Sequence, residues 1–218
     1  MDKILGLLMP AFMETIYMVF FATIFSVIMG LPLGLLAVVT ARGHIMEMPK
    51  LNKVLDIFIN IFRSFPFIIL MILVLPLSRI IVGTTIGSTA SIVPLSISAA
   101  PFVARIVEGA VKEVDRGLLE ASKSLGASSK EIIFKVLLPE AMPSLIHGLI
   151  ITIISLVGYS AMAGAIGGGG LGDLAIRYGY QRFRVDIMIV SVASIILVVQ
   201  GIQFVGNKVV YNINRKRG

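Results

Sequence analysis

The chain has 218 residues, of which 57% are apolar and 14% are charged, and its mean hydropathy is +0.98. These values exclude an ordinary soluble domain and indicate an integral membrane protein. The formal charge of +7 suggests nucleic acid as a partner, but basic residues beside apolar spans also retain loops on the cytoplasmic side, so we expect no nucleic acid. The absence of cysteine excludes a disulfide framework, a thiolate nucleophile and a Cys-ligated metal site, and we expect no metal.

Five stretches of the chain have the length and apolar character that a lipid bilayer requires. A hydrocarbon core of about 30 Å needs roughly 20 apolar residues in a helix. In chain order, the spans are expected at about 15–41, 57–77, 91–107, 141–166 and 187–207, which together form a transmembrane domain over 15–207. The N-terminal segment 1–14 has no convincing cleavage site, so we expect it to be retained. The sequence thus predicts an all-α integral membrane protein with five transmembrane helices.

Two features stand out within these spans. Gly30 and Gly34 have the GxxxG spacing that lets helices approach closely, but Pro32 lies between them, so a kink is an equal alternative. Arg63 lies near the start of the second span, a few residues from its expected cytoplasmic edge. There we favour snorkelling of its guanidinium to the lipid headgroups.

The distribution of basic residues predicts how the chain is oriented. An odd number of spans places the termini on opposite sides, and 14 Lys and Arg residues then fall on the side of the C-terminus against 5 on the side of the N-terminus. The positive-inside bias therefore predicts that segment 1–14 is extracytoplasmic and that residues 208–218 form a basic cytoplasmic tail. Three arginines oppose the bias, and we interpret Arg177, Arg182 and Arg184 as facing a partner or anionic headgroups.

A polar segment, residues 115–139, separates the third and fourth spans and is predicted to form a helix, a turn and a second helix. Leu118, Ala121, Ser122 and Leu125 share one helical face. Gly126 can take the left-handed conformation that a turn after the first helix requires. Ser128 and Glu131 have the capping-box spacing that begins a second helix. Pro139 suits the first turn of span four. These signals alone fit a partner-binding surface and an ordinary solvated loop equally well.

The same segment resembles the EAA signature of ABC-importer permeases. It matches at seven positions: Glu120, Ala121, Ser122, Gly126, Val136, Leu138 and Pro139, with Ser122 and Val136 as mild departures. The resemblance implies that residues 115–139 are the cytoplasmic coupling segment, in which a coupling helix sits in a groove of a separate ATPase subunit. It also implies Glu120 as the charged contact, Ala121 as the close-packed face and Gly126 as the turn.

Longer stretches are similar to the methionine-importer permeases, the membrane subunits of methionine uptake ABC transporters with the type I importer fold. These stretches are NIFRSFPFIIL, VPLSISAAPFVARIVEGA and LVGYSAMAGAIGGGGLGDLAIRYGYQRF. The resemblance implies ATP-driven import of methionine, in the L-form and also in the D-form, across the bacterial cytoplasmic (inner) membrane by alternating access.

The resemblance also implies an assembly. We expect a homodimer of permease chains, because five helices are few for enclosing a gated route and two copies can line one path. Two copies of an ABC ATPase subunit are implied beneath it and an extracytoplasmic methionine-binding protein above it. ATP and Mg would then belong to the ATPase, so this chain is expected to carry no cofactor and to be no enzyme.

The outer part of span four supplies candidates for a pathway or gate. Six glycines fall between residues 164 and 172 without the Lys-Ser/Thr of a phosphate-binding loop. We favour a turn with close backbone packing and keep an outer gate at Gly168 as the alternative. Tyr159, Ser160 and Met162 are candidates for lining the path, with ordinary helix packing as their alternative.

Two further classes of function remain open at this point. The first is a permease of the same architecture that transports another amino acid or small solute in place of methionine. An ATP-independent channel or secondary transporter is disfavoured because the interiors of spans one, four and five contain no carboxylate. An intramembrane enzyme lacks a nucleophile and base pair.

Overall fold

The structure is a computed structural model that describes residues 2–215. Within that range the regular elements are all helical, which confirms the all-α prediction. They are α1 (Asp2–Val39), α2 (Pro49–Ser64), α3 (Phe67–Val82), α4 (Ser88–Lys112), α5 (Arg116–Ser124), α6 (Ser129–Glu131), the π-helical η1 (Ile132–Leu137), α7 (Leu138–Gly164), α8 (Gly170–Asp173), the π-helical η2 (Leu174–Tyr180) and α9 (Val185–Arg215). Residues 216–218 of the basic tail lie outside the described residues.

Among the described residues, four helices are long and apolar enough to cross a membrane. They are Ile4–Val39, Ser88–Lys112, Ser129–Gly164 and Val185–Ile213, and the third runs through α6, η1 and α7. A fifth crossing is obtained when α2 and α3 count together as one broken span. The four or five candidate spans agree with the predicted membrane fold, and segment 1–14 proves to be part of α1 from Asp2 onward.

The second span is not the straight helix that the sequence led us to expect over residues 57–77. It consists of α2 and α3, whose axes are bent by 106°. Phe65 ends α2 in an extended conformation (φ −70°, ψ 131°), and Pro66 precedes the first residue of α3. A residue before proline is pushed away from helical geometry, so the Phe65–Pro66 pair accounts for the break.

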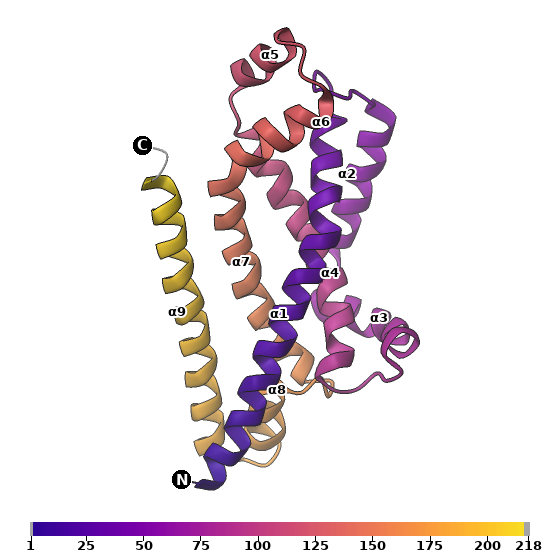
Figure 1. The fold of residues 1–218 in the computed structure, drawn as a ribbon. Coiled ribbons are helices and arrows are strands. Elements are labelled where there is room, and N and C mark those ends of the chain that lie inside the picture. Colours follow the sequence, from indigo (N-terminus) through magenta and orange to yellow (C-terminus); the bar gives the residue numbers. More distant parts are fainter. Residues whose placement is uncertain (1, 216–218) are drawn as a thin grey trace.

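One end of the bundle carries α5, beside the end of α1 and the start of α2 (Figure 1). We call this the coupling end. The N-terminus and α8 lie at the opposite end, and α9 runs along one side of the bundle (Figure 1). The coupling segment, residues 115–139, therefore forms a cap on one end of the long helices.

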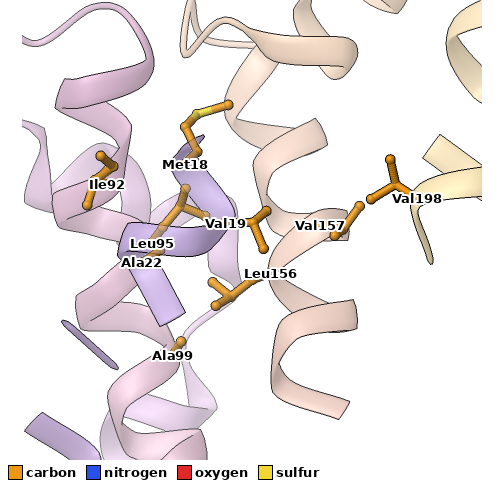
Figure 2. Close-up of a cluster of buried hydrophobic side chains, with 9 residues drawn as sticks. All are labelled: Met18, Val19, Ala22, Ile92, Leu95, Ala99, Leu156, Val157 and Val198. Carbon is orange, nitrogen blue, oxygen red and sulfur yellow. The ribbon is translucent and has the colours of Figure 1, made fainter. Parts of the chain in front are cut away.

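The core near the opposite end joins four helices. Figure 2 shows Met18, Val19 and Ala22 of α1, Ile92, Leu95 and Ala99 of α4, Leu156 and Val157 of α7, and Val198 of α9. Met18, Ala22, Leu95 and Leu156 are fully buried. A second cluster at the coupling end packs Val38 of α1 and Val111 of α4 against Leu119, Ile132 and Leu137.

The GxxxG pair brings α1 and α4 into close contact within one chain. A Cβ on Gly30 would lie 2.5 Å from the carbonyl oxygen of Ala100, and a Cβ on Gly34 would lie 2.4 Å from that of Ala104. These distances are shorter than real Cβ contacts, so only glycine fits at both positions. Pro32 also lies inside α1.

We expect Gly34→Ala to destabilise the bundle because the added methyl group meets the backbone of α4. Overpacking of this kind costs about 1–3 kcal/mol, which corresponds to a fall in Tm of at least about 2 °C for a chain of this size. The matched control is Gly6→Ala in the same helix, where a Cβ would meet nothing within 4 Å. Circular dichroism of the detergent-purified chain would measure both, and an equal Tm for the two variants would contradict this packing.

Candidate functional site

The first helix of the coupling segment is closed at both ends by local hydrogen bonds. Asp115 caps α5 by accepting a hydrogen bond from the backbone N–H of Gly117 at 2.6 Å. At the other end, the N–H of Ala127 donates to the carbonyl of Ser122 and that of Gly126 donates to Lys123. This pair of bonds is the Schellman motif, and Gly126 takes the left-handed conformation that it requires (φ +79°).

The second helix of the coupling segment starts at the predicted capping box. The N–H of Glu131 donates to Ser128 Oγ at 3.3 Å, and the N–H of Ser128 donates to Glu131 Oε2 at 3.1 Å. This helix is not separate from span four, as the sequence predicted, but continues through η1 into α7. The coupling segment is thus joined to the fourth span without a loop.

The seven motif positions are distributed along this element. Glu120, Ala121 and Ser122 lie in the second half of α5, Gly126 forms the turn, Val136 lies in η1, and Leu138 and Pro139 begin α7. Glu120 and Ala121 are exposed, and Ser122 is half-buried with its hydroxyl donating to the carbonyl of Leu118 at 2.7 Å. Glu120 and Ala121 are therefore accessible to a partner protein.

The apolar residues of α5 divide into an anchor and an exposed surface. Leu119 is 8% exposed and packs against α1, α4 and η1. Leu118 is 44% exposed and Leu125 is 87% exposed, and both lie on the face predicted from the helical spacing, with Ala121 between them. Large apolar side chains that remain exposed on a polar, charged segment are typical of a protein-binding surface.

A positively charged cavity of about 370 Å³ lies between α5 and the loop after α1. It is lined by Arg42, His44, Lys112, Arg116 and Lys123, with Asp115 and Glu120 as the acidic groups. Burial lowers the pKa of His44, and the positive charges of Lys123, Arg116 and Lys112 act in the same direction. Both effects disfavour the protonated form of the His44 imidazole.

The glycine run at the far end of α7 is accounted for by turns and backbone packing. Gly167, Gly169 and Gly170 have positive φ, and the N–H of Gly170 donates to Glu14 Oε2 at 2.7 Å. A Cβ on Gly168 would lie 2.7 Å from the carbonyl oxygen of Ala163. The geometry thus supplies a packing reason for Gly168, and a valine there would disturb packing whether or not the run is a gate.

The three pathway candidates in α7 do not converge on one point. Tyr159 is half-buried and stacks on Phe67 of α3, with ring centroids 4.3 Å apart and planes 8° apart. Ser160 is buried and its hydroxyl donates to the carbonyl of Val157 at 2.7 Å. Met162 is exposed. Among these three, Tyr159 is the one that reaches another span through an aromatic contact.

The sequence analysis missed an ionic network that ties α2 to α4. Arg105 donates to Asp56 at 2.8 Å, to Asn60 at 2.6 Å and to Glu108 at 2.6 Å, and Lys112 reaches Glu108 from the next turn. Arg105 and Glu108 have i, i+3 spacing, and Glu108 and Lys112 have i, i+4 spacing, so this part of the network was visible in the sequence. Within residues 2–215, no three His, Cys, Asp or Glu side chains lie close enough together to hold a metal ion.

Comparison with known proteins defines the class of protein first. The family model described as "Binding-protein-dependent transport system inner membrane component" matches residues 30–217. The chain therefore belongs to the family of inner-membrane components of binding-protein-dependent transport systems. A member of this family is the transmembrane, non-enzymatic permease subunit of an ABC transporter, in which the ATPase is a separate subunit.

Individual relatives and solved structures show which members of this family the chain is similar to. The chain is 51% identical over 195 residues to the probable D-methionine transport system permease protein MetI of Pasteurella multocida, covering 89% of this chain and 90% of that relative. It is 47% identical over 178 residues to the methionine import system permease protein MetP of Bacillus subtilis, covering 82% and 80%. A chain from the solved structure "Inward facing conformations of the MetNI methionine ABC transporter" matches with a TM-score of 0.96 and 45% identity over 98% of this chain and 99% of that one. The type I importer permease fold is thereby confirmed.

The Schellman turn makes a specific prediction about Gly126. In Gly126→Val, a β-branched residue must adopt positive φ, which costs roughly 1–2 kcal/mol and reorients Leu125. We expect this variant to insert normally but to co-purify less with the ATPase subunit. Gly126→Asn is the matched control, since asparagine tolerates the left-handed conformation. Equal recovery of the ATPase with both variants would show that the turn geometry does not matter.

Proposed function

We propose that this chain is the membrane permease of an ATP-driven importer for methionine. The observation that carries the proposal is the agreement of sequence and fold over nearly the whole chain with the permease chain of the MetNI methionine ABC transporter. Relatives that share about half of their residues with this chain are named as methionine permeases, some of them for D-methionine. These likenesses support both stereoisomers as substrates.

The proposed assembly contains more chains than this one. The family and the MetNI likeness indicate a dimeric permease in the inner membrane with an ATPase partner. Beyond that, we propose two ATPase subunits at the coupling end and a methionine-binding protein at the opposite end. The coupling end would be cytoplasmic, with the N-terminus outside and the C-terminus inside, as the excess of basic residues favours. We propose no cofactor on this chain, ATP and Mg being held by the ATPase.

In the proposed mechanism, the surface formed by Leu118, Ala121 and Leu125 docks in a groove of the ATPase, with Glu120 as its charged contact. Closure of the ATPase dimer on ATP would displace α5. The Leu119 anchor and the continuous helix from Ser129 to Gly164 would carry that displacement into the spans. Alternating access would follow if α5 and the helix from Ser129 to Gly164 take one position with ATP bound to the ATPase and another without it.

The test is uptake of radiolabelled methionine by vesicles that contain the permease, with and without its ATPase subunit. We expect uptake that requires ATP, the ATPase subunit and the loaded binding protein, and that excess unlabelled methionine abolishes. In a competition panel, uptake suppressed by a different amino acid and not by methionine would identify a permease of the same architecture for that solute. Uptake independent of ATP would instead identify a channel or secondary transporter.

A further inference from the structure

A small polar and aromatic cavity lies where the second span breaks. Its volume is about 250 Å³, and its lining includes Phe62 and Arg63 at the end of α2, Phe67 at the start of α3, Ser98 and Phe102 of α4, and Tyr159 of α7. Three spans thus contribute to one cavity. Residues on both sides of the 106° bend line it, with Phe65 at the break itself.

Arg63 lies near the end of α2 that is far from the coupling end. Arg63 is 14 residues beyond Pro49, the first residue of α2, so it lies about 21 Å along the helix at 1.5 Å per residue. The start of α2 is at the coupling end (Figure 1). Arg63 thus lies near the break in the second span, where it lines the cavity.

Arg63 also differs from the neighbouring arginine in its partners. Arg105 is held by Asp56, Asn60 and Glu108. Within residues 2–215, no hydrogen bond or ion pair satisfies Arg63, and its side chain is exposed in this single chain. A charged group inside a membrane span is costly unless it is paired or serves a substrate pathway. The cavity thus presents a cation whose anionic partner is not supplied by the described chain.

The remaining walls have the chemistry to hold the rest of an amino acid. Phe67 and Tyr159 stack face to face, and Phe62 and Phe102 add two further rings. Aromatic faces attract ammonium groups, and aromatic rings make favourable contacts with thioether sulfur. The hydroxyls of Ser98 and Tyr159 supply oxygens that can accept from an ammonium group.

We propose that this cavity is a substrate subsite within the permease, at which Arg63 binds the α-carboxylate of the transported amino acid. A guanidinium is well suited to this because it binds a carboxylate through two parallel hydrogen bonds. The aromatic walls receive the ammonium group and the thioether side chain. This inference rests on the proposed transport function.

The first test measures methionine uptake and ATP hydrolysis together in proteoliposomes containing permease, ATPase and saturating loaded binding protein. We expect Arg63→Gln to lower methionine uptake per ATP hydrolysed about tenfold and Arg63→Lys to recover part of it, because lysine keeps the charge but loses the bidentate contact. The matched control is Arg79→Gln, an exposed arginine at the other end of the same broken span, which should transport as the wild type does. Unchanged uptake in Arg63→Gln overturns the subsite, and so does an equal, parallel loss of uptake and hydrolysis in Arg63→Gln and Arg63→Lys, which indicates a structural role.

The second test addresses the aromatic walls and does not need Arg63 to be changed. Norleucine has a methylene group where methionine has sulfur. We expect Phe102→Leu to lower the ratio of methionine to norleucine uptake about threefold, because one sulfur–aromatic contact is removed. If Arg63→Gln fails to assemble, this ratio decides the matter, and an unchanged ratio overturns the subsite.

The two proposals can fail separately. Wild-type uptake of methionine tests the proposed function in the same vesicles. If the wild type transports another amino acid instead, the Arg63 experiment is repeated with that amino acid, since every amino acid presents the same α-carboxylate. Methionine uptake that is normal in the wild type and in both cavity variants removes the subsite and leaves the proposed function standing.

Discussion

The close contact of α1 with α4 at Gly30 and Gly34 determines where the other helices can lie. Backbones that approach this closely leave no room for a side chain at either glycine, so the register of the two helices is fixed. Helices α3 and α7 pack on α4, and α2 is tied to α4 by the Arg105 network. Helix α9 packs on α7 and η2. A membrane protein lacks a hydrophobic driving force between its helices, so such close packing and interhelical polar contacts are the forces available to it.

This scaffold connects the two regions to which we assign function. The helix that begins at the Ser128 capping box runs without a loop to Gly164, 36 residues or about 54 Å. It therefore carries the coupling segment at one end and Tyr159, with the glycine run after it, at the other. The cavity at Arg63 is closed on one side by α7 and on another by α4. A displacement of α5 can reach the cavity through these two helices, because neither contains a loop that would absorb the motion.

The sequence predicts local features of this molecule well and long-range ones poorly. The capping box at Ser128 and the left-handed turn at Gly126 depend on residues within a few positions, and both are found. The GxxxG pair was visible, but its partner helix was not, because that depends on packing between distant segments. The break at Pro66 had a local signal, the proline itself, but the continuous hydropathy of residues 57–77 concealed it. The coupling roles proposed for Glu120, Ala121 and Gly126 come from the family signature, because helical periodicity alone fits a solvated loop equally well.

The central claim is that the coupling segment and the far end of α7 move as one element, and a distance measurement tests it directly. The chain contains no cysteine, so spin labels can be attached at Lys130→Cys or at Met162→Cys in the dimeric permease assembled with a cysteine-free ATPase. Lys130 is exposed and lies in the coupling segment outside the proposed docking surface. Electron–electron resonance would measure the label-to-label distance across the dimer with and without ATP. We predict that ATP shortens the distance between the two Lys130 positions and lengthens that between the two Met162 positions. A shorter Lys130 distance with an unchanged Met162 distance would contradict this claim.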